Sequence, residues 1–194
     1  MLTPTNGVTI SADDDAALVG RAREGDPDAY AVLVRRHAPM AMRTAALLGA
    51  GASSEDVVQE ALVKAYRSLD SFRDDRPFRP WLLRIVANEA HNAHRSAVRR
   101  SAREQRAWRP ELLNPAAEVV DREAKEQLLG AIGRLPDKLR RVVTCRYLLE
   151  LDETETAVVL GVPRGTVKSR LSRGLDRLRA DLGAATHDTG VGHV

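Results

Sequence analysis

Residues 161–179 read GVPRGTVKSRLSRGLDRLR, and this stretch decides the fold of the C-terminal part of the chain. Six basic side chains stand in it against one acidic side chain, that of Asp176. Its apolar side chains recur at steps of four, four and three residues, at Val167, Leu171, Leu175 and Leu178. At about 100° per residue these side chains share one side of an α-helix. The stretch therefore predicts a helix with one face for a core and a cationic face beside it.

The residues on either side of this helix predict a helix-turn-helix. A first helix is expected over residues 153–160, a turn at Gly161-Val162 and a second helix begun by Pro163. Asp152 and Glu155 fit the capping-box pattern at the start of the first helix. Short polar groups and long cations on the outer face of the second helix suit the major groove of DNA. DNA binding is therefore favoured over a plain helical hairpin.

The composition of the 194-residue chain favours helices. Apolar residues make up 43% and charged residues 29%, which is ordinary for a soluble globular protein, but aromatic residues make up only 4%. Cores must then be built from Ala, Leu and Val, which favours helices over sheets. Arginine far outnumbers lysine, but a GC-rich genome produces the same excess, so the abundance of arginine alone is weak evidence of nucleic-acid binding.

The positive charge is concentrated in two zones. The net charge is only +3, but nine arginines stand against two glutamates between Arg76 and Arg109, and residues 161–179 form the second zone. Two basic zones separated by neutral chain indicate two contacts with a polyanion. The alternative for either zone alone is a solvated helix face.

Several classes of function lack support in the sequence. Cys145 is the only cysteine, which excludes an intrachain disulfide and favours a reducing compartment; we expect it to pack in a core rather than to sense redox state. His91 and His94 lie three residues apart without a Cys or carboxylate cluster, so no metal and no cofactor are expected. No catalytic motif, membrane span or secretory signal is evident. We therefore expect a non-enzymatic, cytoplasmic protein with no membrane contact of its own.

The order of helix signals predicts an all-α fold of two small helical domains joined by a flexible linker. Asp26-Pro27 opens one helix, Ser53 or Ser54 caps the next, and a loop over residues 71–80 precedes a long helix from Trp81 to about Arg106. The predicted boundaries are a flexible N-terminus at 1–14, an N-terminal domain at 15–106, a linker at 107–122, a C-terminal domain containing the helix-turn-helix at 123–183 and a disordered tail at 184–194.

Three longer stretches carry a resemblance to a known family. Residues 135–174, LPDKLRRVVTCRYLLELDETETAVVLGVPRGTVKSRLSRG, are similar to the C-terminal domain of the extracytoplasmic-function (ECF) sigma factors of bacterial RNA polymerase, most distinctively in GTVKSRL. Residues 55–73, EDVVQEALVKAYRSLDSFR, resemble the helix with which these factors grip the polymerase clamp. Residues 78–95, FRPWLLRIVANEAHNAHR, resemble the promoter-melting helix. The resemblance covers roughly residues 15–183. Asp152 departs from the usual serine cap, but it caps equally well.

The resemblance implies an alternative sigma factor that binds core RNA polymerase and directs promoter-specific initiation. The N-terminal domain would melt the minus-ten element and the helix-turn-helix would recognise the minus-thirty-five element. The implied partners are the polymerase clamp and flap, promoter DNA and an anti-sigma factor, and no homo-oligomer is expected. The alternative is a free-standing helix-turn-helix regulator that binds DNA as a dimer, which leaves the N-terminal domain unexplained.

The resemblance also assigns roles to residues. The candidates for minus-thirty-five DNA are Arg164, Thr166, Lys168, Ser169, Arg170, Ser172 and Arg173, of which Arg164 and Arg170 are expected on phosphates. The candidates for minus-ten DNA are Phe72, Arg73, Arg76, Phe78, Arg79, Trp81, Asn88 and Arg95. The loop from Arg73 to Arg79 would cradle a flipped base. The alternative is that Phe78 and Trp81 are core residues, which we prefer for Trp81, and that Asn88 is a surface amide, which we do not prefer.

A third set of candidates belongs to the stretch that resembles the polymerase-binding helix. Its outward residues are Asp56, Gln59, Glu60, Lys64 and Arg67. Periodicity alone does not separate this helix from an ordinary buried one, so these polymerase contacts depend on the resemblance.

Overall fold

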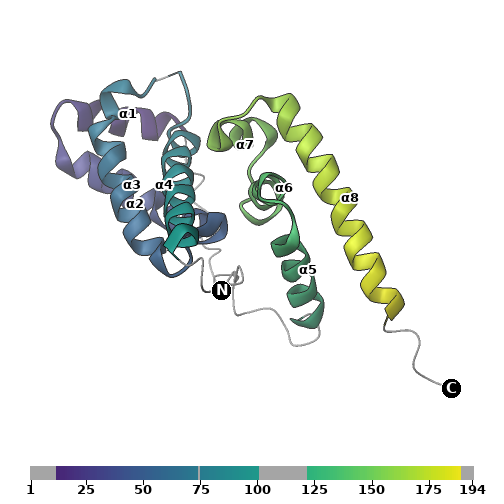
Figure 1. The fold of residues 1–194 in the computed structure, drawn as a ribbon. Coiled ribbons are helices and arrows are strands. Elements are labelled where there is room, and N and C mark those ends of the chain that lie inside the picture. Colours follow the sequence, from purple (N-terminus) through teal and green to yellow (C-terminus); the bar gives the residue numbers. More distant parts are fainter. Residues whose placement is uncertain (1–11, 74, 101–121, 189–194) are drawn as a thin grey trace, which may run out of the picture.

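The structure, a computed structural model, describes residues 12–73, 75–100 and 122–188, and these are helical without strands (Figure 1). The N-terminal block holds α1 (Ala12–Arg23), α2 (Pro27–Ala45), η1 (Ala46–Ala50), η2 (Gly51–Ser53), α3 (Ser54–Arg67), η3 (Leu69–Ser71) and α4 (Phe78–Arg100). The C-terminal block holds α5 (Arg122–Arg134), α6 (Asp137–Val143), η5 (Thr144–Leu148), α7 (Glu153–Leu160) and α8 (Arg164–Asp188). The all-α prediction is confirmed, whereas the predicted linker lies outside the described residues up to position 121.

Three helix boundaries follow the local signals in the sequence. The Asp26 carboxylate accepts hydrogen bonds from the backbone N–H groups of Asp28 and Ala29 at 2.9 and 3.2 Å, with Pro27 in the first turn of α2. Asp152 and Glu155 form the complete capping box of α7. Gly161 ends α7 with φ of +64°, in the left-handed region that glycine adopts without strain. The helix-turn-helix is therefore present as predicted.

Three other local predictions need correction. Ser53 occupies the N-cap position of α3 without a side-chain hydrogen bond, and the Ser54 hydroxyl instead donates back to the Gly51 carbonyl at 2.6 Å. The long helix α4 begins at Phe78 rather than at Trp81, because a proline within the first turn has no intrahelical N–H bond to lose. The last helix, α8, continues to Asp188, past the predicted start of the tail at residue 184.

The N-terminal block packs α1 to α4 around two groups of buried side chains. One group joins α1, α2 and α4 through residues such as Val19, Leu33 and Leu82, and it includes Phe72 and Phe78. Leu62 and Ile85 pack against both groups. Most of the buried side chains are Ala, Leu and Val, in agreement with the low aromatic content.

In the C-terminal block, α8 lies against α5, α6 and α7. Val167 is fully buried. Leu178 belongs to the buried cluster of this block, and Leu171 and Leu175 pack against that cluster. Gly174 lies where α8 meets α6: a Cβ atom at this position would stand 2.8 Å from Cγ2 of Val143. The two helices can approach this closely because residue 174 has no side chain.

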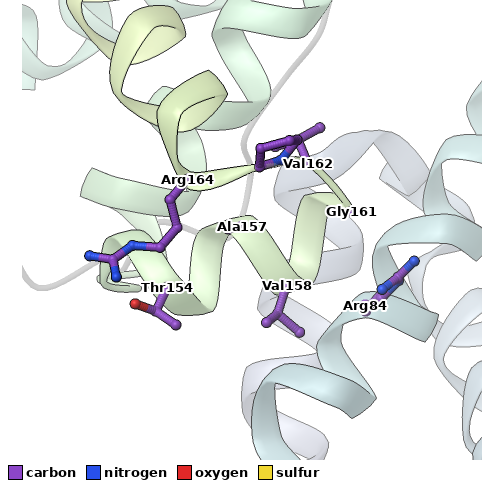
Figure 2. A pocket seen from close by; sticks show the side chains of 8 residues that line it. Arg84, Thr154, Ala157, Val158, Gly161, Val162 and Arg164 are labelled. Atoms are coloured by element: carbon purple, nitrogen blue, oxygen red, sulfur yellow. The ribbon is translucent and has the colours of Figure 1, made fainter.

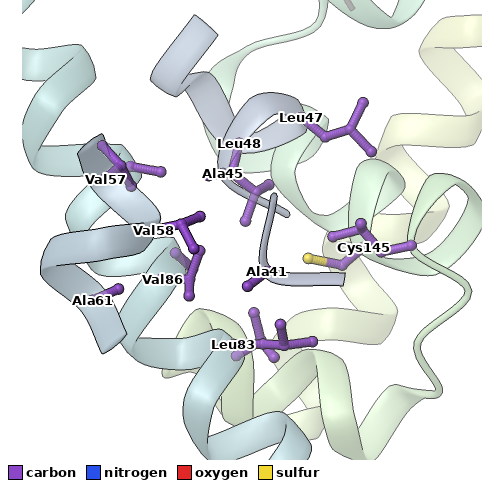
Figure 3. Close-up of a cluster of buried hydrophobic side chains, with 14 of the residues drawn as sticks. Ala41, Ala45, Leu47, Leu48, Val57, Val58, Ala61, Leu83, Val86 and Cys145 are labelled. Atoms are coloured by element: carbon purple, nitrogen blue, oxygen red, sulfur yellow. The ribbon is translucent and has the colours of Figure 1, made fainter. Parts of the chain in front are cut away.

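The second group of buried side chains in the N-terminal block also takes in side chains of the C-terminal block, so the two blocks pack directly on one another (Figures 1 and 3). Cys145, Leu149, Leu151 and Val159 come from the C-terminal block, and they meet N-terminal side chains that include Leu83 of α4. Cys145 is fully buried there, as predicted, and burial raises the pKa of its thiol to about 12.

Candidate nucleic-acid interface

The outer face of α8 collects the predicted minus-thirty-five residues on one surface. Lys168, Ser169, Ser172 and Arg173 are exposed on this face, within six consecutive residues. Arg173 Nε donates to the Ser169 carbonyl oxygen at 3.1 Å, so the guanidinium lies along the helix surface. The Ser169 hydroxyl donates to the Thr166 carbonyl oxygen at 3.2 Å. Arg164 is exposed, whereas Thr166 and Arg170 are half-buried.

Glu153 of α7 faces two of these cations. Its Oε2 atom lies 3.8 Å from an Arg164 guanidinium nitrogen and 3.7 Å from Lys168 Nζ. The sequence analysis did not single out Glu153, because the contact crosses the turn between the two helices. One carboxylate is therefore shared by two cations of the predicted DNA-binding face.

Two of the predicted minus-ten residues lie in the core rather than on the surface. Phe72 is 5% exposed and Phe78 is 4% exposed. Their ring centroids lie 5.8 Å apart, and Trp81 lies 5.1 Å from Phe72 and 5.5 Å from Phe78. In this arrangement the two phenylalanine rings support the loop and do not face solvent, so neither is placed to contact a base. Trp81 is half-buried, which agrees with the preferred core role.

The loop between the two phenylalanines presents charged groups to solvent. Arg73, Asp75 and Arg76 are exposed, and the backbone N–H of Arg76 donates to the Arg73 carbonyl oxygen at 3.1 Å. Arg73 also pairs with Asp75 at 2.9 Å. Aromatic packing of Phe72 on Phe78 holds the two ends of this loop close together.

One face of α4 is also cationic. Arg84, Asn88 and Arg95 are exposed, and at about 100° per residue they fall within about 40° of one another around the helix. Arg84 was not among the predicted site residues, although its spacing of four from Asn88 was a usable signal.

The guanidinium of Arg84 lies 3.5 Å from the position that a Cβ atom would take at Gly161. It lines an open groove of about 430 Å³ with Val158, Gly161 and Arg164 (Figure 2).

Arg79 connects the two blocks near this groove. Its guanidinium lies 3.9 Å from Glu155, the residue that completes the α7 capping box. Arg79 is half-buried rather than fully presented to solvent. In this conformation it is therefore shared between the start of α4 and the helix-turn-helix.

The outer face of α3 carries all five residues predicted to bind the polymerase. Asp56, Gln59, Glu60 and Arg67 are exposed, while Lys64 is half-buried and bonded to Glu89 of α4 at 2.7 Å. The same helix exposes two apolar side chains that the sequence analysis did not select: Val63 is 42% exposed and Tyr66 is 47% exposed. Apolar groups surrounded by charged ones are typical of a protein-binding surface.

The histidines of α4 have packing contacts. A Cβ atom at Gly49 would stand 3.3 Å from the His94 side chain, and the pKa of His91 is lowered chiefly by burial and by nearby Arg141. Among the described residues, no three His, Cys, Asp or Glu side chains gather as a metal site. Within the same residues, no helix combines the length and apolar character needed to cross a bilayer.

The comparisons with known proteins match the N-terminal and the C-terminal block to two separate family models. The family model for sigma-70 region 2 matches residues 33–100, and the model for sigma-70 region 4 matches residues 125–178. The chain is 34% identical over 170 residues to the ECF RNA polymerase sigma-E factor of Escherichia coli K12. The aligned segment covers 82% of this chain and 89% of that protein. The sigma-E factor of Haemophilus influenzae is also 34% identical, over 82% of this chain and 90% of the relative.

Solved structures agree with this assignment. CnrH, solved in complex with the cytosolic domain of CnrY, superposes with a TM-score of 0.66 at 28% identity, over 88% of this chain and 98% of CnrH. The sigma factor RpoE of Bartonella quintana, solved with the anti-sigma factor NepR, gives a TM-score of 0.62 at 24% identity, over 79% of this chain and 96% of RpoE. The latter likeness supports the fold.

A chain with region 2 before a helix-turn-helix of region 4 has the architecture of a sigma-70-type transcription initiation factor. The identity to the sigma-E proteins over most of the chain is decisive within that class: this chain belongs to the ECF sigma factors. It is thus an alternative sigma factor that acts in transcription initiation with RNA polymerase and promoter DNA. The free-standing regulator is not favoured, because the region 2 match accounts for the N-terminal block. Sigma factors are initiation factors rather than enzymes.

Proposed function

We propose that three surfaces of this chain have separate roles in transcription initiation. The outer face of α8 reads the minus-thirty-five element, the loop 73–77 with one face of α4 opens the minus-ten element, and the outer face of α3 binds core RNA polymerase. The observation that carries this proposal is the presence of two separate cationic surfaces in one chain, on α8 and on α4.

On α8, the exposed side chains and the half-buried Arg170 divide by chemistry. Lys168, Ser169, Ser172 and Arg173 reach base edges in the major groove, because lysine and arginine donate to guanine and serine serves either as donor or as acceptor. Arg164 and Arg170 hold phosphates and fix the register of the helix on the duplex. The ion pairs of Glu153 with Arg164 and Lys168 open when DNA arrives.

On the N-terminal block, opening a promoter needs a surface that stabilises unstacked bases. Arg73 and Arg76 of the loop supply cations beside an extruded base, while Asn88 hydrogen-bonds a neighbouring base. Arg84 and Arg95 share the Asn88 face and hold the phosphates of the separated strand. Phe72, Phe78 and Trp81 act beneath this surface by fixing the loop.

On α3, the exposed Val63 and Tyr66 join the predicted polar residues. They supply apolar area for the polymerase clamp, and the charged residues around them set the orientation. The catalysis of RNA synthesis then belongs to the polymerase, and the site of action is the cytoplasm, where promoter DNA is transcribed.

An anti-sigma factor is the expected inhibitory partner. CnrH was solved with the cytosolic domain of CnrY, and RpoE of Bartonella quintana was solved with the anti-sigma factor NepR. An inhibitor of this kind would cover the polymerase-binding surfaces, and no homo-oligomer is required.

Run-off transcription tests the proposal. Transcript-start mapping after overexpression first supplies a cognate promoter, and purified chain is then combined with core polymerase on that template. We expect initiation at the mapped start, which depends on both promoter elements. A free-standing regulator would give no promoter-dependent transcript from chain and core alone, and that outcome would reject the proposal.

A further inference from the structure

Helix α1 lies outside the segment that matches sigma-70 region 2, which begins at residue 33. It nevertheless contacts Leu69 and Phe72, just before the loop 73–77. Arg23 is the last residue of α1. Its Nε donates to the Leu69 carbonyl oxygen at 2.9 Å, and its terminal NH₂ group donates to the Phe72 carbonyl oxygen. The same guanidinium lies 5.9 Å from the centre of the Phe72 ring. One planar cation thus fixes both backbone and ring where the chain enters the loop 73–77.

A second contact from α1 supports the other end of the loop. Asp15 Oδ2 lies 2.8 Å from Nε2 of His37 in α2, and both side chains are almost fully buried. An ionised carboxylate only accepts, so His37 Nε2 carries the proton and its ring orientation is fixed. That ring lies 5.4 Å from the ring of Phe78, where the chain leaves the loop. Arg36 donates to the other Asp15 oxygen at 2.6 Å and completes the network.

The two contacts act on a single unit, because Phe72 and Phe78 also touch each other and Trp81. We propose that Asp15, Arg23 and His37, which we call the α1 brace, are positioning residues: they hold Phe72 and Phe78, the two ends of the loop that receives an unstacked promoter base, in place. This inference rests on the proposed role of the loop in opening the minus-ten element. The brace touches no DNA; it keeps the loop from losing order before the base arrives.

The inference is tested with Arg23→Ala in reconstituted holoenzyme. Opening is followed by permanganate reactivity of thymines, on a duplex promoter and on the same promoter with the minus-ten region already unpaired. We expect opening of the duplex to fall on the order of tenfold, the effect of losing a hydrogen bond to a charged group. Initiation from the unpaired template and binding to core polymerase should stay near the parental values, because neither needs the loop to capture a base from a duplex.

Arg21→Ala is the matched control. It removes the same charge from the same helix, but Arg21 pairs with Asp26 rather than with the loop. Opening with this variant should be unchanged. If Arg23→Ala does not fold, Arg23→Lys replaces it: lysine keeps the charge but cannot donate to both carbonyl oxygens through a planar fork. An intermediate loss of opening is then expected.

Trp81 supplies a direct signal of loop order. In a Trp108→Phe background it is the only tryptophan, and Arg23→Ala should increase its quenching by acrylamide well below the unfolding temperature. Equal losses on the duplex template, on the unpaired template and in polymerase binding would mean a merely structural role and overturn the inference. Arg76→Ala distinguishes failure of the α1 brace from failure of the proposed role of the loop. If Arg76→Ala impairs opening and Arg23→Ala does not, the brace is wrong; if neither Arg76→Ala nor Asn88→Ala impairs opening, the proposed role of the loop is wrong.

Discussion

Glu153 of α7 lies 3.7 Å from Lys168 Nζ on α8, so a carboxylate stands against the cationic face of the helix proposed to bind DNA. The same carboxylate lies 3.8 Å from Arg164. Lys168 and Arg164 are about two-thirds exposed, and ion pairs of this kind stabilise a protein by only about 0.2–1 kcal/mol. These ion pairs are therefore weak enough for contacts with DNA to replace.

Glu153→Gln should strengthen binding to a promoter fragment that carries the upstream element. Removing the competing carboxylate should raise affinity up to about fivefold at low salt, with the gain shrinking at high salt. The measurement is fluorescence anisotropy of labelled DNA with holoenzyme at two salt concentrations. Glu55→Gln removes an exposed charge from α3 and serves as control. Equal affinities for Glu153→Gln and the parent would show that the ion pairs do not compete with DNA.

Arg173→Ala should weaken binding to the cognate minus-thirty-five element by about 1–3 kcal/mol, the range for one good contact to a base. Arg179→Ala is the control, because Arg179 is also exposed on α8 but pairs with Asp176 at 2.7 Å. Competition with altered upstream sequences should show relaxed specificity for Arg173→Ala alone. An unchanged binding constant would remove Arg173 from the reading surface.

Asn88→Ala should leave upstream binding intact and reduce strand opening. The expected sign is a loss of permanganate reactivity at downstream thymines in holoenzyme complexes of normal affinity. Asn92→Ala, one turn further along α4 and also exposed, controls for the loss of an amide. Persistent opening with Asn88→Ala would refute the assignment of Asn88 to a base.

Gly174→Ala should destabilise the C-terminal block. The added methyl group would stand 2.8 Å from Cγ2 of Val143, and the stiff valine side chain gives way poorly. Overpacking of this kind costs about 1–3 kcal/mol, against about 1 kcal/mol gained in helix propensity. Gly165→Ala in the same helix meets nothing within 4 Å and should be neutral or stabilising. Urea unfolding compares the two; equal stabilities would contradict the close packing of α6 on α8.

The stability of the fold should decrease as the pH falls below about 6.5, in part because of His37. Burial lowers the pKa of His37 beneath its ordinary value of 6.5; Asp15 opposes this shift, while Arg36 and Arg79 add to it. Between the lowered pKa of His37 and 6.5, the unfolded chain binds more protons than the folded chain. The free energy of unfolding therefore decreases as the pH decreases through that window.

His37→Gln should flatten this pH dependence in urea unfolding from pH 7.5 to pH 5.5. His91, whose pKa is also lowered by burial, acts in the same direction, and the double variant should be flatter still. A slope equal to that of the parent would exclude His37 as a source of the effect.

The parts of the fold that depend on neighbouring residues could be predicted from the sequence. The capping box of Asp152 and Glu155 and the stop at Gly161 are local geometry, and they fix the helix-turn-helix without reference to the rest of the chain. The apolar steps from Val167 to Leu178 likewise fixed the buried face of α8.

The parts that depend on distant residues could not be predicted in this way. Phe72 and Phe78 are an aromatic pair beside a charged loop, a pattern that fits base stacking as well as it fits a core. Their burial is settled by α1 and α2, which lie far away in the sequence. Glu153 was missed for the same reason, because the cations it faces lie on another helix. Arg84 was missed although its spacing of four from Asn88 was a usable signal in the sequence.

The buried cluster that joins the two blocks contains a thiol whose reactivity reports on their separation. Its single sulfhydryl, on Cys145, is walled in by side chains from both halves, and the high pKa keeps it in the unreactive thiol form. A labelling reagent can therefore attack it only when the halves part or unfold. The rate of that reaction would time the separation directly, with no engineered dye, and would compare the free chain with the chain on its polymerase.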